Sequence, residues 1–362
     1  MRWRGVGIGL GLAGIACAAW LLLAAGAPDI VAVDRSHLPA QPVEDARQVW
    51  PPPGMPGFPV SGVAVAPDGT LLVLHRAGRG FSDETTPITE PVILRVDPAT
   101  GAELARYGAG LFASPHGLSI APDGSIWVTD TALNTVTRLS PEGAVLAVLG
   151  APYPAWLEPM LRLRNLLPRL RVPMTPDTFA RPTSAAPLAG GGIAVTDGYR
   201  NARLVVFDGD GRLSFEVNAR GDGPGEFHLP HGITVLPDGR LAVADRRNAR
   251  LQVFSAKGVF LWQRGPDVVG RPFDVAVDSA GCLHVLDGGD ELDGGAPWGA
   301  VVTLSPAGDL LARRGGPGQK RGQFALPHAI AAGADGSVYV AELGNARVQA
   351  LPPVEGCGAA GR

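Results

Sequence analysis

An internal repeat constrains the fold of this chain more than any other feature of its sequence. A proline–histidine pair, an apolar run and an Asp-Gly turn follow in the same order at residues 115–124, 230–239 and 327–336. Degenerate copies bring the units to six, starting near residues 60, 115, 182, 230, 272 and 327. Apolar and polar residues alternate within each unit, as β-strands require. Such a unit cannot bury both faces of its sheet alone. We therefore expect an all-β, six-bladed β-propeller, with an open solenoid as the weaker alternative.

The propeller is placed at residues 57–355, followed by a short tail at 356–362. Residues 1–27 carry Arg2 and Arg4 before a long apolar run, which fits either a signal peptide or an uncleaved N-terminal membrane anchor helix. Positive charge before the run predicts that the propeller lies on the far side of the membrane: secreted, periplasmic or extracytoplasmic and membrane-anchored. Residues 28–56, with three consecutive prolines, are expected to form an extended linker.

One segment interrupts the repeats. Residues 151–180 combine many leucines with Arg162, Arg164, Arg169 and Arg171, which predicts a short, basic, amphipathic helical insert between blades two and three. The favoured interpretation is a flap packed on the propeller rim. The alternatives are a contact with a membrane surface or a lid over the site.

Charge and cysteine content limit the kinds of binding partner and of metal ligand that this chain can use. The formal net charge of -3 gives no reason to expect a nucleic-acid partner. Outside the leader only Cys282 and Cys357 remain, too few for a disulfide framework, and the chain has no C-x-x-C pair. A metal site would therefore use histidine or carboxylate ligands. We expect a monomer.

The third strand of several units begins with an Asn-Ala-Arg triplet, at residues 201–203, 248–250 and 345–347. These triplets resemble the NHL class of propeller repeat. Because they recur, we interpret them as structural: the asparagine suits a hairpin turn, and the arginine is expected to pair within or between blades.

Three histidines share one register of the repeat. His116, His231 and His328 each precede the aspartate of the turn by seven residues, and the other blades carry Ser61, Thr183 and Phe273 there. Histidines in blades two, four and six should converge on the central channel, where three imidazoles can hold a metal with an open position. Zinc, copper, iron and nickel all suit this donor set. The structural alternative is a turn element whose imidazole bonds a neighbouring carbonyl.

A second ring lies fifteen residues further along each unit and consists of Arg76, Thr131, Gly198, Arg246, Gly288 and Leu343. Its two arginines favour an anionic substrate group such as a carboxylate. Tyr199 follows Gly198. The structural alternatives are a salt bridge from Arg246 to Asp245 and simple rim packing of Tyr199.

Matching segments along residues 57–352 resemble the peptidyl-α-hydroxyglycine α-amidating lyase family. They include residues 61–64, 75–76, 115–120, 127–130, 197–199, 243–246 and 326–328. The resemblance implies that His116, His231 and His328 bind zinc, that Tyr199 is the catalytic base, and that Arg76 and Arg246 face the substrate. The implied reaction cleaves the C–N bond of a peptidyl- or N-acyl-α-hydroxyglycine to give a C-terminal amide and glyoxylate.

The family pattern also implies a structural calcium ion, held by the backbone carbonyls of Val63 and Leu118 and by an aspartate after the third histidine. Ala329 stands at that last position, which removes the charged ligand and argues against calcium. Two alternative functions are also consistent with the sequence. One is a non-catalytic NHL propeller that binds a peptide or glycan. The other is a different metal-dependent hydrolase, such as a lactonase, using Asp287 and Asp290.

Overall fold

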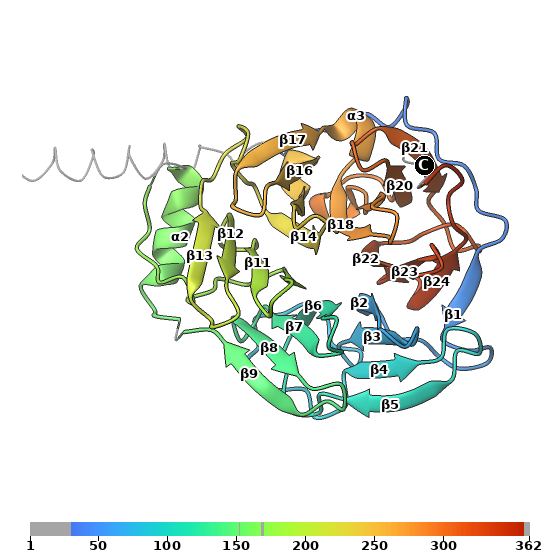
Figure 1. Cartoon of the computed structure of the whole chain (residues 1–362), viewed down its shortest axis with the longest axis horizontal. Helices are drawn as coiled ribbons and strands as arrows, with labels where there is room; N and C mark the ends of the chain where they lie inside the picture. The colour runs from blue at the N-terminus through green and yellow to red at the C-terminus, as the bar shows by residue number, and fades with distance from the viewer. Residues whose placement is uncertain (1–29, 152, 168–169, 358–362) are drawn as a thin grey trace, which may run out of the picture.

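The computed structural model describes residues 30–151, 153–167 and 170–357. The expected signal peptide or anchor at 1–27 lies outside these residues. No helix among the described residues is long and apolar enough to cross a membrane. The described chain forms six four-stranded antiparallel sheets arranged around a central axis, which confirms the expected six-bladed β-propeller (Figure 1).

Each blade has its first strand at the axis and its fourth at the rim. Blade one contains β2 (Val60–Val65), β3 (Leu71–His75), β4 (Ile93–Val96) and β5 (Glu103–Tyr107). Blade two contains β6 (Pro115–Ile120), β7 (Ile126–Asp130), β8 (Thr135–Leu139) and β9 (Val145–Leu149). Blade three contains β10 (Ser184–Pro187), β11 (Ile193–Asp197), β12 (Arg203–Phe207) and β13 (Leu213–Val217).

The second half of the ring repeats this order. Blade four contains β14 (Pro230–Val235), β15 (Leu241–Asp245), β16 (Arg250–Phe254) and β17 (Phe260–Arg264). Blade five contains β18 (Pro272–Val277), β19 (Leu283–Asp287), β20 (Ala300–Leu304) and β21 (Leu310–Gly315). Blade six contains β22 (Pro327–Ala332), β23 (Val338–Glu342), β24 (Arg347–Leu351) and β1 (Arg47–Trp50).

Apolar side chains of adjacent blades pack against each other and form the core. Leu204 and Val206 of blade three, for example, share a cluster with Val243 and Phe254 of blade four. The second strand of every blade is buried along its whole length, whereas β5 and β17 at the rim leave every second residue exposed. The second strands are therefore mostly apolar at successive positions, as strands buried on both faces are.

The ring is closed by the N-terminal strand. β1 pairs antiparallel with β24 and becomes the outer strand of blade six. The segment expected as an extended linker at 28–56 therefore contains a strand, because the edge of β24 offers backbone groups that β1 can pair with. The two ends of the propeller meet in a single sheet.

The chain before β1 runs along blade five. Arg35 forms ion pairs with Asp287 and Asp290, and Gln41 forms a bridge with Arg314. In blades three, four and six the equivalent buried acid pairs instead with the arginine of the Asn-Ala-Arg triplet, within one blade. Blade five has Ala300 at that place, opposite Asp287. Arg35 thus supplies the cation that this blade lacks.

The expected insert contains helix α2 (Leu157–Leu166), beside β13 at the rim (Figure 1). Leu157 and Leu161 are fully buried and pack with Val172 and Ala180, while Arg164 contacts Asn201. This packing agrees with the favoured rim flap. The other short helices are α3 (Pro266–Val269), η1 (Arg246–Asn248) and η2 (Glu291–Asp293).

Cys282 and Cys357 form one disulfide, which joins the β18–β19 turn to the C-terminal segment. Two cysteines are too few for a framework, but their spatial proximity allows this single link. The sequence argument did not foresee it, because the two cysteines are 75 positions apart in the chain.

Candidate metal centre

The three histidines occupy equivalent places on the innermost strands of alternate blades. Each follows a proline at the start of β6, β14 or β22, and in each strand the pairing register shifts across the histidine. Such bulges turn a side chain away from the ladder. The same shift occurs in β2 and β18, which carry Ser61 and Phe273 at this position, so the bulge belongs to the first strand of the repeat and the histidine uses it.

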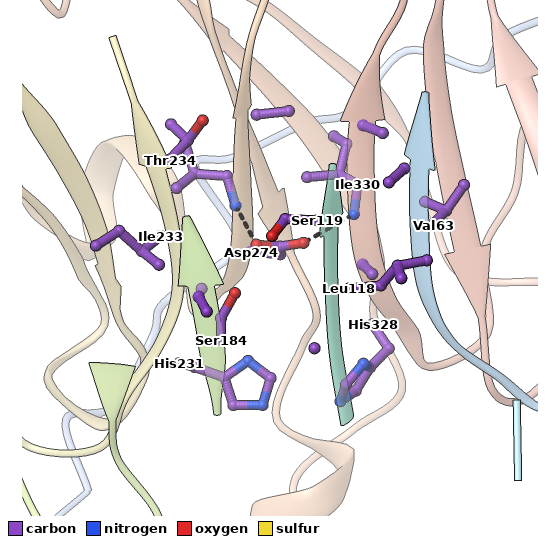
Figure 2. A pocket seen from close by; sticks show the side chains of 18 of the residues that line it. Val63, Leu118, Ser119, Ser184, His231, Ile233, Thr234, Asp274, His328 and Ile330 are labelled. Carbon is purple, nitrogen blue, oxygen red and sulfur yellow. Dashed lines mark hydrogen bonds between the residues drawn. The ribbon is translucent and has the colours of Figure 1, made fainter. Parts of the chain in front are cut away.

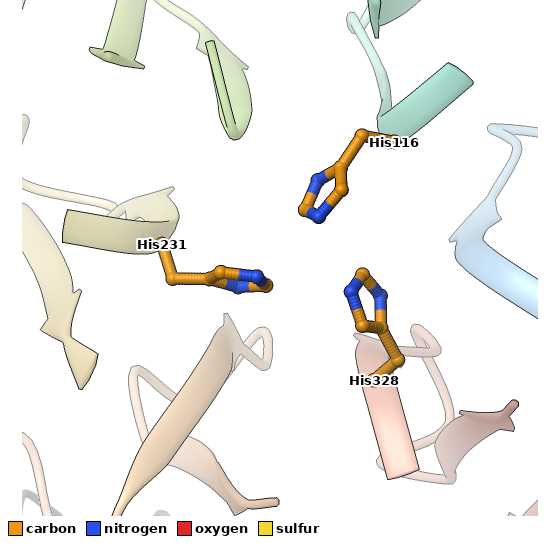
Figure 3. A group of neighbouring side chains, drawn as sticks. All are labelled: His116, His231 and His328. Carbon is orange, nitrogen blue, oxygen red and sulfur yellow. The ribbon is translucent and has the colours of Figure 1, made fainter. Parts of the chain in front are cut away.

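The imidazoles of His116, His231 and His328 point toward one another at the axis (Figure 3). Their ring centroids are 4.7 to 5.1 Å apart, and one nitrogen of each lies within 4.8 Å of the others. The geometric expectation from the repeat register is met. All three side chains are buried.

The remaining blades orient these rings. The Nδ1 atoms of His116, His231 and His328 each lie 2.7 Å from a backbone carbonyl, contributed in turn by the three other members of the first ring, Thr183, Phe273 and Ser61. A carbonyl only accepts, so each Nδ1 carries the proton and each Nε2 presents a lone pair. Outer hydrogen bonds of this kind fix histidine tautomers at metal sites. The structural alternative, an imidazole bonded to a neighbouring carbonyl, is therefore observed. These hydrogen bonds also orient the three rings toward one another.

Burial and neighbouring positive groups keep the imidazoles neutral. They hold the pKa values of His116 and His231 well below the ordinary histidine range, and that of His328 falls to about 3. Arg76 contributes to all three shifts, after burial. Neutral imidazoles with converging lone pairs are the donor set that a first-row transition metal requires, so these residues fit such an ion.

Tyr199 lies directly beside this cluster. Its hydroxyl oxygen is 2.9 Å from Nε2 of His116 and 3.3 Å from Nε2 of His231. Phe81, from the loop between β3 and β4, packs on Tyr199 with ring centroids 5.0 Å apart. The phenol is therefore held at the place where a group bound to the three histidines would meet it.

Arg76 and Arg246 line the same cavity as Tyr199 and His328, with a volume of about 380 Å³. Burial lowers the pKa of Arg76, an effect that its attraction to Tyr199 opposes. Arg76 donates from Nε to the carbonyl of Pro115 at 3.0 Å, which fixes it next to His116. The guanidinium of Arg246 stacks over Phe273 at 4.2 Å. Both guanidiniums are rigidly placed beside the metal centre, where an anion can bind.

A second cavity of about 210 Å³ lies in the channel on the other side of the histidines. Val63 and Leu118 line it (Figure 2), and so does Ala329. The carboxylate of Asp274 projects into the same space and accepts hydrogen bonds from the backbone N–H groups of Val275 and Ile330. Burial raises the pKa of Asp274 to about 7.

Asp274 was missed by the sequence argument, although the register contained the signal. It directly follows Phe273, the first-ring residue of blade five, just as Ala329 follows His328 in blade six. The carboxylate expected in blade six is therefore found one blade earlier.

Other residues of the cavity wall were also missed. Asn165 lies in α2, Arg247 lies in η1, and the others lie in loops: Phe81, Arg181, Arg200, Arg220 and His228. Conversely, Asp287 and Asp290, the carboxylates of the lactonase-like alternative, form ion pairs with arginines. Asp245, considered as a partner of Arg246, forms an ion pair with Arg250.

Comparisons with known proteins agree with these features. Residues 227–254 match the NHL repeat family. The chain is 33% identical over 315 residues to a peptidyl-glycine alpha-amidating monooxygenase B of Xenopus laevis, covering 81% of this chain and 34% of that protein. It is 31% identical over 332 residues to peptidyl-alpha-hydroxyglycine alpha-amidating lyase 1 of Drosophila melanogaster, covering 83% of this chain and 58% of that protein.

The chain thus spans about a third of the Xenopus protein and just over half of the Drosophila one. Among solved structures, a gluconolactonase from Xanthomonas campestris superimposes with a TM-score of 0.56, covering 90% of this chain and 95% of that one at 15% identity. This last likeness concerns the propeller fold alone.

Proposed function

The chain is a homologue of the peptidyl-α-hydroxyglycine α-amidating lyases and contains an NHL repeat, and from this premise we propose that it is a zinc-dependent carbon–nitrogen lyase. Its substrate would be a peptide or N-acyl compound that ends in α-hydroxyglycine. The observation that carries the proposal is the phenol of Tyr199, whose oxygen lies within hydrogen-bond distance of Nε2 of two of the three converging, neutral imidazoles.

His116, His231 and His328 would hold the metal through Nε2. A zinc ion bound there would act as a Lewis acid that lowers the pKa of the substrate hydroxyl. Arg76 and Arg246 would bind the carboxylate of the α-hydroxyglycine in the same cavity. Their fixed guanidiniums would orient the reacting carbon toward Tyr199.

Tyr199, as a tyrosinate stabilised by the neighbouring positive charges, would act as the general base. Its oxygen would take the proton of the substrate hydroxyl, the C–O bond would become a carbonyl, and the electron pair of the C–N bond would pass to nitrogen. The tyrosine would return the proton to the nitrogen, which leaves as the amide, and glyoxylate would remain. Atoms balance without an oxidant, reductant or added water.

The test is glyoxylate release from α-hydroxyhippurate by the purified protein. We expect Tyr199→Phe to lower kcat by about 100-fold or more, the usual contribution of a general base. Tyr107→Phe, on the outer strand β5, is the matched control and should retain activity. Full activity in a Tyr199→Phe, His231→Ala double variant would refute the proposed mechanism.

Two rivals make different predictions. A non-catalytic propeller would contain less than one metal ion per chain after purification. A lactonase would need acidic ligands at the mouth, but Asp287 and Asp290 form ion pairs with Arg35, and Asp290 also pairs with Arg271. The arrangement of the carboxylates therefore favours the lyase over the lactonase.

We also propose that the protein works outside the cytoplasm. The basic, apolar leader and the Cys282–Cys357 disulfide support this location, since disulfides persist in oxidising compartments. Finding the folded propeller in the cytoplasmic fraction with both thiols reduced would contradict it.

A further inference from the structure

One side of the cavity beside the three histidines is apolar. Phe81, Leu292 and Leu343 line this cavity together with Arg76 and Tyr199. Phe81 comes from the β3–β4 loop of blade one, Leu292 from η2 in blade five, and Leu343 from the end of β23 in blade six. Blades five, six and one adjoin, since β18 contacts β22 and β22 contacts β2. The three apolar side chains therefore come from consecutive blades and form one arc of the cavity wall.

The opposite side of the wall is mostly polar. Arg181 precedes β10, Arg200 follows β11, His228 precedes β14 and Arg247 follows β15, which assigns all four to blades three and four. Leu229, an apolar residue on that side, is buried. The cavity thus has two chemically different sides, and the apolar arc lies over blades five, six and one.

Two side chains of the apolar arc are large and exposed. Phe81 is 46% exposed and Leu292 is 50% exposed. In the same loop as Phe81, Ile88 is fully buried and its N–H donates to the carbonyl of Phe112 at 2.7 Å. Ile88 therefore anchors the loop in the core, and that anchoring does not require Phe81. Large apolar groups that stay exposed in a cavity gain free energy when a ligand removes them from water.

Phe81 is held at the cavity by its neighbours. Its ring packs on Tyr199 with ring centroids 5.0 Å apart, and the guanidinium carbon of Arg76 lies 5.6 Å from its centroid. An ion pair between Asp83 and Arg181 ties the β3–β4 loop to the segment before β10. The ring is thus placed beside the reacting groups before any ligand binds.

Leu292 and Leu343 are fixed through their backbone. The N–H of Leu343 donates to the carbonyl of Leu326 at 3.0 Å. Helix η2, which carries Leu292, begins directly after Asp290, and Asp290 forms an ion pair with Arg35. A surface that is ordered before binding loses little conformational entropy when a ligand covers it.

We propose that Phe81, Leu292 and Leu343 form an apolar subsite for the acyl group on the substrate nitrogen. This rests on the proposed function, which places the α-hydroxyglycine at the histidines and Tyr199. The acyl carbonyl of such a compound is bonded to the nitrogen of the C–N bond that breaks, so the acyl group begins next to Tyr199, against which Phe81 packs. The substrate class is then an α-hydroxyglycine whose nitrogen carries an apolar acyl group, either a simple acyl chain or a peptide with an apolar last residue.

The test is a direct binding measurement that does not depend on turnover. N-Acetylglycine and N-hexanoylglycine carry the same carboxylate, and the second has a longer apolar chain. We expect the wild-type holoprotein to bind the hexanoyl compound about tenfold more tightly in calorimetry, because the arc covers part of the added chain. In a Phe81→Ala, Leu292→Ala variant this ratio should fall to about twofold, while the affinity for N-acetylglycine stays the same.

The controls separate the subsite from general surface hydrophobicity. A Leu104→Ala, Leu310→Ala variant removes exposed apolar side chains from the outer strands of the same two blades and should keep the tenfold ratio. Phe81→Leu, which retains an apolar side chain, should keep most of it. Equal affinity of the wild type for the two acylglycines would overturn the subsite. A tenfold ratio that survives in the Phe81→Ala, Leu292→Ala variant would do so too.

Failure of the proposed function gives a different result. A protein that prefers N-hexanoylglycine but releases no glyoxylate from any α-hydroxyglycine substrate would retain the subsite and lose the lyase activity. A protein that releases glyoxylate equally fast from N-acetyl- and N-hexanoyl-α-hydroxyglycine, with equal affinity for the two acylglycines, would lose only the subsite.

Discussion

At the scale of single residues, the first ring divides its work between side chains and backbone. Three members give imidazoles, and the other three, Ser61, Thr183 and Phe273, orient them with carbonyls. A carbonyl is present whatever the side chain is. The residue types at these three positions therefore do not indicate that their carbonyls orient the imidazoles. The histidines themselves can be predicted from the repeat register.

Asp274 should make stability depend on pH. Its pKa is raised from 3.8 to about 7 in the folded chain, so the folded state binds the proton more tightly than the unfolded state. In the folded chain the neutral carboxyl is favoured below about pH 7. The stability from this difference is fully present below about pH 4 and is lost as the pH rises toward 7. We expect the wild type to lose a few kcal/mol relative to Asp274→Asn, about 1.4 per unit of pKa difference as an upper bound.

The measurement is urea unfolding of both proteins at pH 5 and pH 8, in EDTA so that no divalent cation holds the carboxylate ionised. The histidine contributions are common to both proteins and cancel in the difference. Parallel pH profiles would show that Asp274 does not titrate in this range.

At the scale of elements, the N-terminal segment completes two blades. It supplies β1 to blade six and Arg35 to blade five, where the repeat has Ala300 in place of its arginine.

Strand alternation and turns predicted the blades, because those signals are local. β1 has no repeat motif and its partner β24 lies at the other end of the chain, so only the folded ring reveals it. The walls of the cavity were hidden for the same reason: Arg220 and Asn165 come from a loop and a helix outside the register.

Removing Arg35 should destabilise the propeller substantially. Arg35→Ala leaves Asp287, whose side chain is 0% exposed, without its cation. Breaking one side of a buried pair costs about 3–5 kcal/mol. Arg212→Ala is the matched control, because Arg212 pairs with Asp210 and both are largely exposed, with an expected effect of about 0.5 kcal/mol. Chemical denaturation measures the free energy of unfolding of the two variants. Equal losses would mean that the ion pair of Arg35 contributes no more than an exposed one.

At the scale of the whole molecule, the three histidines of the candidate metal centre come from three blades that do not adjoin. A metal bound by His116, His231 and His328 would hold the native ring and would have no equivalent site in the unfolded chain. The ring and the site should therefore be thermodynamically linked.

Chelation should lower the unfolding temperature, and one equivalent of zinc should restore it. His328→Ala should abolish stoichiometric metal, measured by elemental analysis of the purified protein. His37→Ala is the control, because this histidine is exposed and is not one of the three histidines at the axis. An unchanged melting curve in chelator, together with less than one metal per chain, would mean that the triad does not hold a metal.

Closure by β1 has a consequence for how the protein is made. The third imidazole, His328, resides in the same sheet as β1 and β24, so the blade that carries it needs both the earliest and the latest parts of the propeller to be present. A nascent chain that has exposed only four or five blades offers the ion two nitrogens at most. A metal that needs all three nitrogens would therefore bind only after the sixth blade has formed.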